Sequence, residues 1–186
     1  MTKIANARIL IMATNGFEQS ELMVPRDKLR EAGAEVHIAS LDGKPIRGWD
    51  QTDWGESVPA DRKIAEVNAA NYDAIVLPGG QINPDLLRVE NSALTLLRSF
   101  YDQGKTVAAI CHAPWLLVET GIAKGRKLTS YHSVRTDIEN AGGEWRNEPV
   151  VADQGLVTSR NPNDLDAFVA KIIEEIEEGR HMREAA

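Results

Sequence analysis

The sequence predicts an α/β protein in which a mostly parallel sheet is covered by helices on both faces. Strand-like apolar runs alternate along the chain with segments whose apolar residues recur at helical spacing. The runs at 73–78 and 106–110 are apolar at most positions, which is typical of parallel strands because both of their faces are buried. Without repeats or a low-complexity linker, residues 1–186 are expected to form a single domain.

Each element follows from its local pattern. Strands are expected at 8–13, 34–40, 73–78, 106–110, 127–130, 150–151 and 156–158, and helices at 18–32, 83–103, 113–119, 134–141 and from 163 onwards. Pro25 should delay or kink the first helix. Asn83 and Pro84 suit the N-cap and first position of the next one.

Two segments depart from this alternation. Around 41–60, glycines, prolines and tryptophans interrupt the pattern, which favours an irregular, hairpin-like excursion. Within this excursion, Trp49 and Trp54 are either buried at an interface or packed against other residues of the excursion. At the other end of the chain, the acidic end of the last helix opposes the helix dipole, so the tail after 178 is expected to fray.

Composition narrows the classes of partner. A net charge of −7 argues against a nucleic-acid-binding surface. No window approaches the roughly 18 apolar residues of a membrane span, and the apolar run at 9–13 is too short for a signal peptide. Cys111 is the only cysteine, so no internal disulfide can form. We therefore expect a cytoplasmic protein without nucleic-acid or membrane partners.

Cys111 is the candidate nucleophile. It stands between a buried strand and a short helix, the arrangement of a nucleophile elbow, and the helix N-terminus should lower its pKa. The alternative is a buried, inert cysteine. His112 could act as acid or base, could offer its backbone N–H to an oxyanion, or could be an ordinary hydrogen-bonded histidine.

Further candidates follow two other strands. Ligands bind beyond the carboxyl ends of parallel strands, and Glu18, Gly79, Gly80 and Asp85 are expected at that edge. The glycine N–H groups could contact an oxyanion or substrate, or form a plain turn. The two acids could be catalytic or merely favoured in a first helical turn. The four histidines lack metal-ligand spacing, so we expect no metal and no other cofactor.

Taken together, six segments resemble the PfpI family of the class I glutamine amidotransferase-like superfamily. They are "GFEQSEL" (16–22), "DAIVLPGG" (73–80), "AAICHAPWLL" (108–117), "GRKLTSY" (125–131), "NAGGEW" (140–145) and "LVTSRNPNDL" (156–165). The resemblance covers nearly the whole chain in order. It implies a flavodoxin-like three-layer sandwich with Cys111 as the nucleophile in the elbow.

The resemblance also assigns roles to other residues. It implies that His112 and Glu18 lie beside the cysteine, and that Asp85 is the triad acid and reaches the site from a neighbouring subunit. This implies a homo-oligomer, a dimer or a hexamer. The loop before Asp85 is one residue longer than the form commonest in the family.

Three functions fit these residues. Addition of the Cys111 thiolate to a reactive aldehyde, with proton transfer by His112 or a carboxylate, would make a glyoxalase- or deglycase-like stress enzyme acting on small carbonyls or glycated protein and peptide substrates. An intracellular cysteine peptidase is the second prediction, because peptide hydrolysis also needs an extended cleft that the sequence does not reveal. The third is a redox-sensing protective protein or chaperone that responds to oxidation of Cys111.

Overall fold

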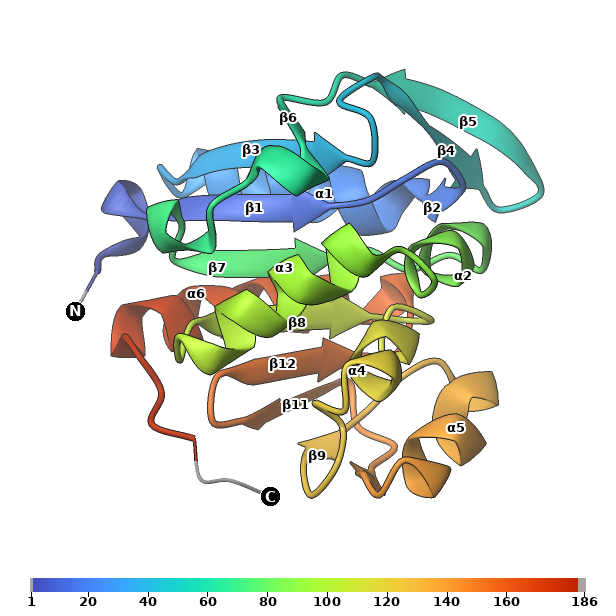
Figure 1. Ribbon diagram of the computed structural model, residues 1–186, viewed down its shortest axis with the longest axis vertical. Helices are drawn as coiled ribbons and strands as arrows, with labels where there is room; N and C mark the ends of the chain where they lie inside the picture. Colours follow the sequence, from blue (N-terminus) through green and yellow to red (C-terminus); the bar gives the residue numbers. More distant parts are fainter. Residues whose placement is uncertain (1, 184–186) are drawn as a thin grey trace.

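The computed structural model describes residues 2–183 and is built around a seven-stranded sheet of order β11-β12-β8-β7-β1-β3-β6 (Figure 1). Its strands are β1 (Arg8–Met12), β3 (Glu35–Ser40), β6 (Arg62–Lys63), β7 (Ala74–Leu77), β8 (Thr106–Ile110), β11 (Val150–Asp153) and β12 (Leu156–Ser159). All neighbouring pairs are parallel except β11–β12. The predicted fold class is confirmed.

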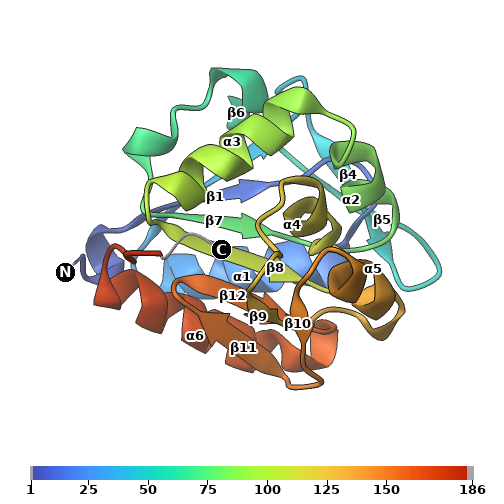
Figure 2. The same cartoon turned by 60° about the horizontal axis from the view of Figure 1, so that its bottom comes forward.

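Helices cover both faces of this sheet (Figure 2). The α-helices are α1 (Gln19–Glu31), α2 (Ile82–Leu87), α3 (Asn91–Asp102), α4 (Trp115–Glu119), α5 (Arg135–Asn140) and α6 (Leu165–Glu178). Short 3₁₀ turns are η1 (Ile4–Asn6), η2 (Ile64–Glu66), η3 (Ala69–Asn71), η4 (His132–Val134) and η5 (Pro162–Asp164). Helices α1 and α6 pack together on one face, and α3 lies against β7 and β8 on the other.

The core consists of two apolar clusters, one on each face of the sheet. Along β1, Leu10 and Met12 belong to the cluster beneath α3, whereas Ile9 and Ile11 belong to the cluster beneath α1 and α6. Successive side chains of a strand point to opposite faces, so a strand covered on both sides must be apolar at every position. This explains the continuous apolar runs in the sequence.

The predicted helix at 83–103 is wrong as a single element. The structure has α2 and α3 instead, separated at residues 88–90. Asn83 is buried within α2 rather than serving as its cap. Its side-chain oxygen accepts the N–H of Thr14 at 2.7 Å, and its amide nitrogen donates to the carbonyl of Pro78 at 2.9 Å. It therefore ties α2 to the loops that follow β1 and β7. Pro25 lies inside α1, which continues through it.

Two small sheets flank the main one. The first joins β2 (Phe17–Glu18) in parallel to β4 (Ile46–Asp50), which forms an antiparallel hairpin with β5 (Asp53–Val58). This hairpin projects near the carboxyl ends of the main strands (Figure 1). The second sheet pairs β9 (Lys127–Leu128) with β10 (Glu144–Trp145). Within residues 2–183, no helix is long and apolar enough to cross a membrane.

The chain after α6 is anchored as far as Arg183. The N–H of His181 donates to the carbonyl of Gly104 at 2.8 Å. The Arg183 guanidinium donates to carbonyl oxygens of three residues, Tyr101, Lys105 and Gln154. The tail predicted to fray after 178 is thus held over 179–183, and its remainder, 184–186, lies outside the described residues.

Candidate active site

A cavity of about 370 Å³ lies beyond the carboxyl ends of β1, β7 and β8. It brings together the loop after β1, the glycine loop after β7, the residues after β8 and the tip of the β4–β5 hairpin. The lining residues are Gly16, Glu18, Glu21, Trp49, Gln51, Gly80, Gln81, Ile82, Cys111, His112, Tyr131 and Pro162. This is the edge at which a parallel α/β sheet binds its ligands.

Cys111 occupies a sharp turn at the end of β8. Its φ is +64°, in the left-handed region that a residue with a Cβ rarely adopts. The backbone is held there because the Cys111 N–H donates to the carbonyl of Ser159 at 3.0 Å and the Cys111 carbonyl accepts the N–H of Tyr131 at 2.8 Å. The side chain is 6% exposed and lines the cavity. These features define a nucleophile elbow.

His112 turns its ring towards the sulfur of its own neighbour. Its Nδ1 lies 3.1 Å from the Sγ of Cys111, and its Nε2 lies 3.3 Å from the Oγ of Ser133. The ring stacks on Tyr131, with centroids 4.8 Å apart and an interplanar angle of 23°. Burial, and after it the charge of His132, lowers the pKa of His112. A neutral ring with its proton on Nε2 leaves Nδ1 free to accept the thiol proton.

The carboxyl group that the structure places beside the sulfur is that of Glu21. It is fully buried, and its Oε2 accepts the N–H of Gly79 at 2.8 Å. Burial raises the pKa of Glu21 to about 8, although the Gly79 hydrogen bond lowers it. A side chain with this pKa is mostly protonated at neutral pH and can donate a hydrogen bond to sulfur or to a bound oxygen.

The expectation that the elbow lowers the pKa of Cys111 is not met in this structure. Burial, and next the charge of Glu21, raises the pKa of the thiol, while the N–H groups of Gly80 and His112 act in the opposite direction. Helix α4 also begins only at Trp115 and is five residues long, so it contributes little dipole at the sulfur. Formation of a thiolate therefore requires a group that takes the thiol proton, and the Nδ1 of His112, 3.1 Å from the sulfur, is in position to do so.

The predicted site residues fall into two groups. Glu18 precedes α1, is half-buried and lines the cavity; burial, followed by the charge of Asp50, raises its pKa. Gly80 also lines it, whereas the N–H of Gly79 is taken by Glu21. Asp85 is exposed on α2 and is not part of the cavity lining. Within this chain, Asp85 therefore lies outside the candidate site.

Sequence reasoning missed Glu21, although the sequence holds a signal for it. The buried side of α1 consists of Glu21, Leu22, Pro25 and Leu29. An acid within an otherwise apolar helical stripe must be buried, and buried acids are uncommon without a functional or structural reason. Glu18 precedes the helix and has no place in that stripe.

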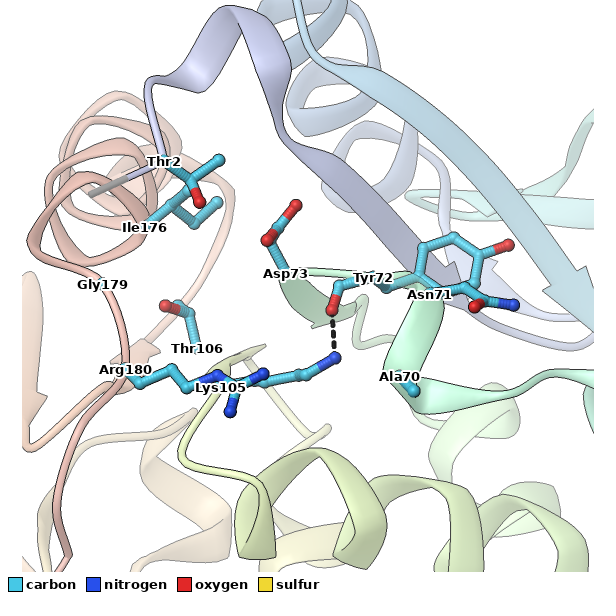
Figure 3. Close-up of a pocket in the computed structure, with 10 residues that line it drawn as sticks. All are labelled: Thr2, Ala70, Asn71, Tyr72, Asp73, Lys105, Thr106, Ile176, Gly179 and Arg180. Atoms are coloured by element: carbon cyan, nitrogen blue, oxygen red, sulfur yellow. Dashed lines mark hydrogen bonds between the residues drawn. The ribbon is translucent and has the colours of Figure 1, made fainter.

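Two other groups of polar residues lie outside this site. At the opposite end of the sheet, a cavity of about 260 Å³ holds Lys105, whose ammonium donates to the carbonyls of Ala69 and Tyr72 and is thereby satisfied (Figure 3). Elsewhere, the ligand atoms of Glu175, Glu178 and His181 lie within 4.8 Å of one another. These could hold a metal ion, but His181 already bonds to the backbone carbonyl of Glu175 at 3.2 Å.

The fold and the elbow define an α/β protein with a candidate cysteine nucleophile, and comparison with known proteins specifies it further. Residues 7–175 match the DJ-1/PfpI family. The chain is 42% identical over 166 residues to "Deglycase PfpI" of Pyrococcus furiosus, covering 89% of this chain and 97% of that protein. It is 38% identical over 162 residues to "Putative cysteine protease YraA" of Bacillus subtilis, covering 87% and 93%.

A solved structure agrees with these matches. The crystal structure of Drosophila melanogaster DJ-1beta superimposes with a TM-score of 0.82 at 32% identity, covering 96% of this chain and 95% of that one. The chain belongs to the DJ-1/PfpI family. The resemblance seen in the sequence is thereby confirmed.

Proposed function

We propose that this protein is a cysteine-dependent enzyme that removes reactive carbonyls or repairs their adducts on proteins, as a glyoxalase or deglycase. The observation that carries the proposal is the Cys111 sulfur held 3.1 Å from the Nδ1 of His112 in a 370 Å³ cavity with the buried Glu21 carboxyl. The name of the Pyrococcus furiosus relative, a deglycase, supports it. A reducing compartment such as the cytoplasm would keep Cys111 active.

The chemistry can be followed with methylglyoxal as substrate. Nδ1 of His112 takes the thiol proton as Sγ of Cys111 bonds to the aldehyde carbon, and the aldehyde oxygen becomes a hydroxyl by gaining a proton from Glu21 or His112. The product is a hemithioacetal. The N–H groups of Gly80 and His112 are placed to stabilise charge on sulfur during this step.

The hemithioacetal is then isomerised without an external oxidant. The former aldehyde carbon loses its hydrogen as a proton and is oxidised, while the neighbouring ketone carbon gains a proton and is reduced, giving a lactoyl thioester of Cys111. Water cleaves the C–S bond, releasing lactate and restoring the thiol. With a hemiaminal adduct on an amine, Sγ of Cys111 displaces the amine: the C–S bond forms as the C–N bond breaks, and the amine leaves with a proton from Glu21 or His112. The same hemithioacetal results and reacts onwards as before.

The isomerisation needs a group that carries a proton from one carbon to the next. We propose that Asp85 serves in a neighbouring copy of the chain. The α2 region supports this, because Ile82 and Leu86 of α2, and Val89 two residues beyond its end, flank Asp85 in the sequence and are exposed at 36%, 45% and 76%. An exposed apolar patch of this kind favours contact between subunits. Glu18, which lines the cavity of its own chain, is the alternative carrier.

Peptide hydrolysis is the second candidate function. The name of the Bacillus subtilis relative favours it, and a pair of Cys111 and His112 could form an acyl-enzyme. A single 370 Å³ cavity suits a small carbonyl better than an extended peptide. Redox sensing through Cys111 is disfavoured because oxidation needs the thiolate, and burial raises the pKa of this thiol.

The test is methylglyoxal consumption with identification of the product, in wild type and in Cys111→Ser. We expect lactate from the wild type and none above background from the variant. Casein is offered to the same preparations in parallel. Casein cleavage that needs Cys111, without lactate formation, would replace the proposal with the peptidase.

A further inference from the structure

The β4–β5 hairpin forms part of the cavity wall. Trp49 and Gln51 from this hairpin line the cavity. The hairpin is fixed to the loop after β1, because the N–H of Gly16 donates to the carbonyl of Arg47 at 2.8 Å and the N–H of Arg47 donates to Oδ1 of Asn15 at 2.7 Å. Its position relative to Cys111 is therefore set by the backbone.

Trp49 stands directly beside Glu18. The two are cross-strand partners in the parallel pairing of β2 with β4, so their side chains leave the ladder on the same side. The indole Nε1 of Trp49 donates to the carbonyl of Gln51 at 3.1 Å, and the ring meets Trp54 edge to face at 5.6 Å. With its only donor used, Trp49 offers the cavity an apolar π surface.

The cavity lining beside Trp49 includes acids and no lysine or arginine among the described residues, because the Arg47 guanidinium of the same hairpin lies over Trp54, 5.9 Å from that ring's centroid. Glu18 is half-buried in the lining, and Asp50, the residue after Trp49, adds a second carboxylate nearby. Glu21 contributes a third carboxyl, and its Oε1 is buried with no hydrogen-bond partner among residues 2–183. An unpartnered buried carboxyl oxygen in a cavity is free to exchange a hydrogen bond with a ligand, as a donor while the carboxyl is protonated. A π surface beside carboxylates is the environment that binds a cation.

We propose that Glu18 and Trp49 form a subsite for a guanidinium group, so that the preferred substrates are carbonyl adducts of arginine side chains. A guanidinium is planar and delocalised, stacks on an indole, and presents parallel N–H donors to a carboxylate. Glu18 accepts these donors, Trp49 covers the plane, and the adduct carbon is directed towards Sγ of Cys111. This inference rests on the proposed carbonyl chemistry, but its ligand recognition can be measured without turnover.

The experiment measures how ligands protect Cys111 from alkylation by iodoacetamide in the full-length protein, read by mass spectrometry of the Cys111 peptide. The ligands are N-acetylarginine amide, its neutral isostere N-acetylcitrulline amide, and N-acetyllysine amide. We expect arginine to bind about tenfold more tightly than citrulline, because only arginine gains the ionic and cation–π contacts. Lysine should fall between them because its ammonium is compact and not planar.

Variants assign the preference to the two side chains. Glu18→Gln should reduce the ratio of arginine to citrulline affinity to near one. Trp49→Leu should lower the ratio, and Trp49→Phe should keep most of it. Glu56→Gln, which removes an exposed acid of β5 outside the cavity, should leave the ratio unchanged. Each variant is compared with its own ligand-free alkylation rate, so altered thiol reactivity does not enter the ratio.

The outcomes separate this inference from the proposed function. Equal binding of arginine and citrulline by the wild type, or an arginine preference that survives Glu18→Gln, overturns the subsite even if methylglyoxal is converted to lactate. An arginine preference lost in Glu18→Gln supports the subsite even if no lactate forms, and in that case only the carbonyl chemistry fails.

Discussion

The Nδ1 atom of His112 lies 3.1 Å from the sulfur of Cys111, the residue that immediately precedes it in the chain. Adjacent side chains within a helix do not face one another. Here they meet because Cys111 is in the left-handed region and α4 starts only at Trp115. The turn therefore brings a thiol and an imidazole from two consecutive residues into contact.

The rate should depend on pH through two groups. His112 must be neutral to accept the thiol proton, and its pKa lies below the 6.5 of a free histidine. Glu21 must be protonated to donate, and its pKa is about 8. We expect kcat/KM to be flat around neutral pH and to fall as pH rises through about 8. In Glu21→Gln, whose amide cannot ionise, the alkaline fall should vanish; an unchanged fall would remove Glu21 from the reaction.

The same carboxyl should make stability depend on pH. The pKa of Glu21 is raised from 4.5 to about 8 on folding, so between these values the folded state keeps a proton that the unfolded state releases. The free energy of unfolding should then fall with rising pH, by at most about 1.4 kcal/mol per pH unit from this group. Urea unfolding at several pH values should show a smaller fall in Glu21→Gln, while Glu56→Gln should keep the wild-type slope.

Backbone strain at the elbow can be measured directly. The φ of +64° at Cys111 penalises any residue with a Cβ, and glycine avoids the penalty. We expect Cys111→Gly to unfold with a free energy about 1 kcal/mol higher than Cys111→Ala, although glycine ordinarily destabilises relative to alanine. Both variants should be inactive. A less stable glycine variant would show that the turn is not strained.

The glycine loop after β7 should tolerate no side chain. A Cβ at Gly80 would lie 2.6 Å from the carbonyl oxygen of Gly16 and 2.7 Å from the backbone nitrogen of Glu18. Gly121 has a φ of +71°, close to the +78° of Gly80, but nothing lies within 4 Å of the position that a Cβ at Gly121 would occupy. Gly121→Ala should therefore cost about 1 kcal/mol from its backbone conformation alone.

Gly80→Ala adds a backbone clash to that cost. Its free energy of unfolding should drop by at least about 2 kcal/mol more than in Gly121→Ala, and its activity should fall with it. Chemical denaturation of the two variants compares them at matched φ. Equal losses would mean that the loop can move away from Gly16 and Glu18.

The sheet was predictable because burial on both faces forces a continuous apolar pattern, as in β7 and β8. Cys111 was predictable because it follows such a strand. The division of 83–103 into α2 and α3 was not, because Leu86, Leu94 and Leu97 keep a helical spacing across the break. Local preference favours Asn83 as a cap, but it carries no information about the distant partners of Asn83, Thr14 and Pro78.

The location of the site was predictable, but the contacts between its side chains were not. The carboxyl ends of β1, β7 and β8 do converge on one cavity. Which acid reaches the sulfur depends on the rotation of α1, which turns Glu21 inward. The direction of the Cys111 pKa shift depends on burial, which the elbow pattern alone does not reveal.

The most direct test of the account is to find the covalent bond between Cys111 and the carbonyl carbon. Wild-type protein turning over methylglyoxal is quenched in acid, digested and examined by mass spectrometry, with His112→Ala prepared in parallel. We predict one methylglyoxal equivalent on the peptide that contains Cys111, and far less of it in His112→Ala because the thiol then lacks its base. Lactate formation with no adduct on Cys111, or with adducts only on other side chains, would contradict the account.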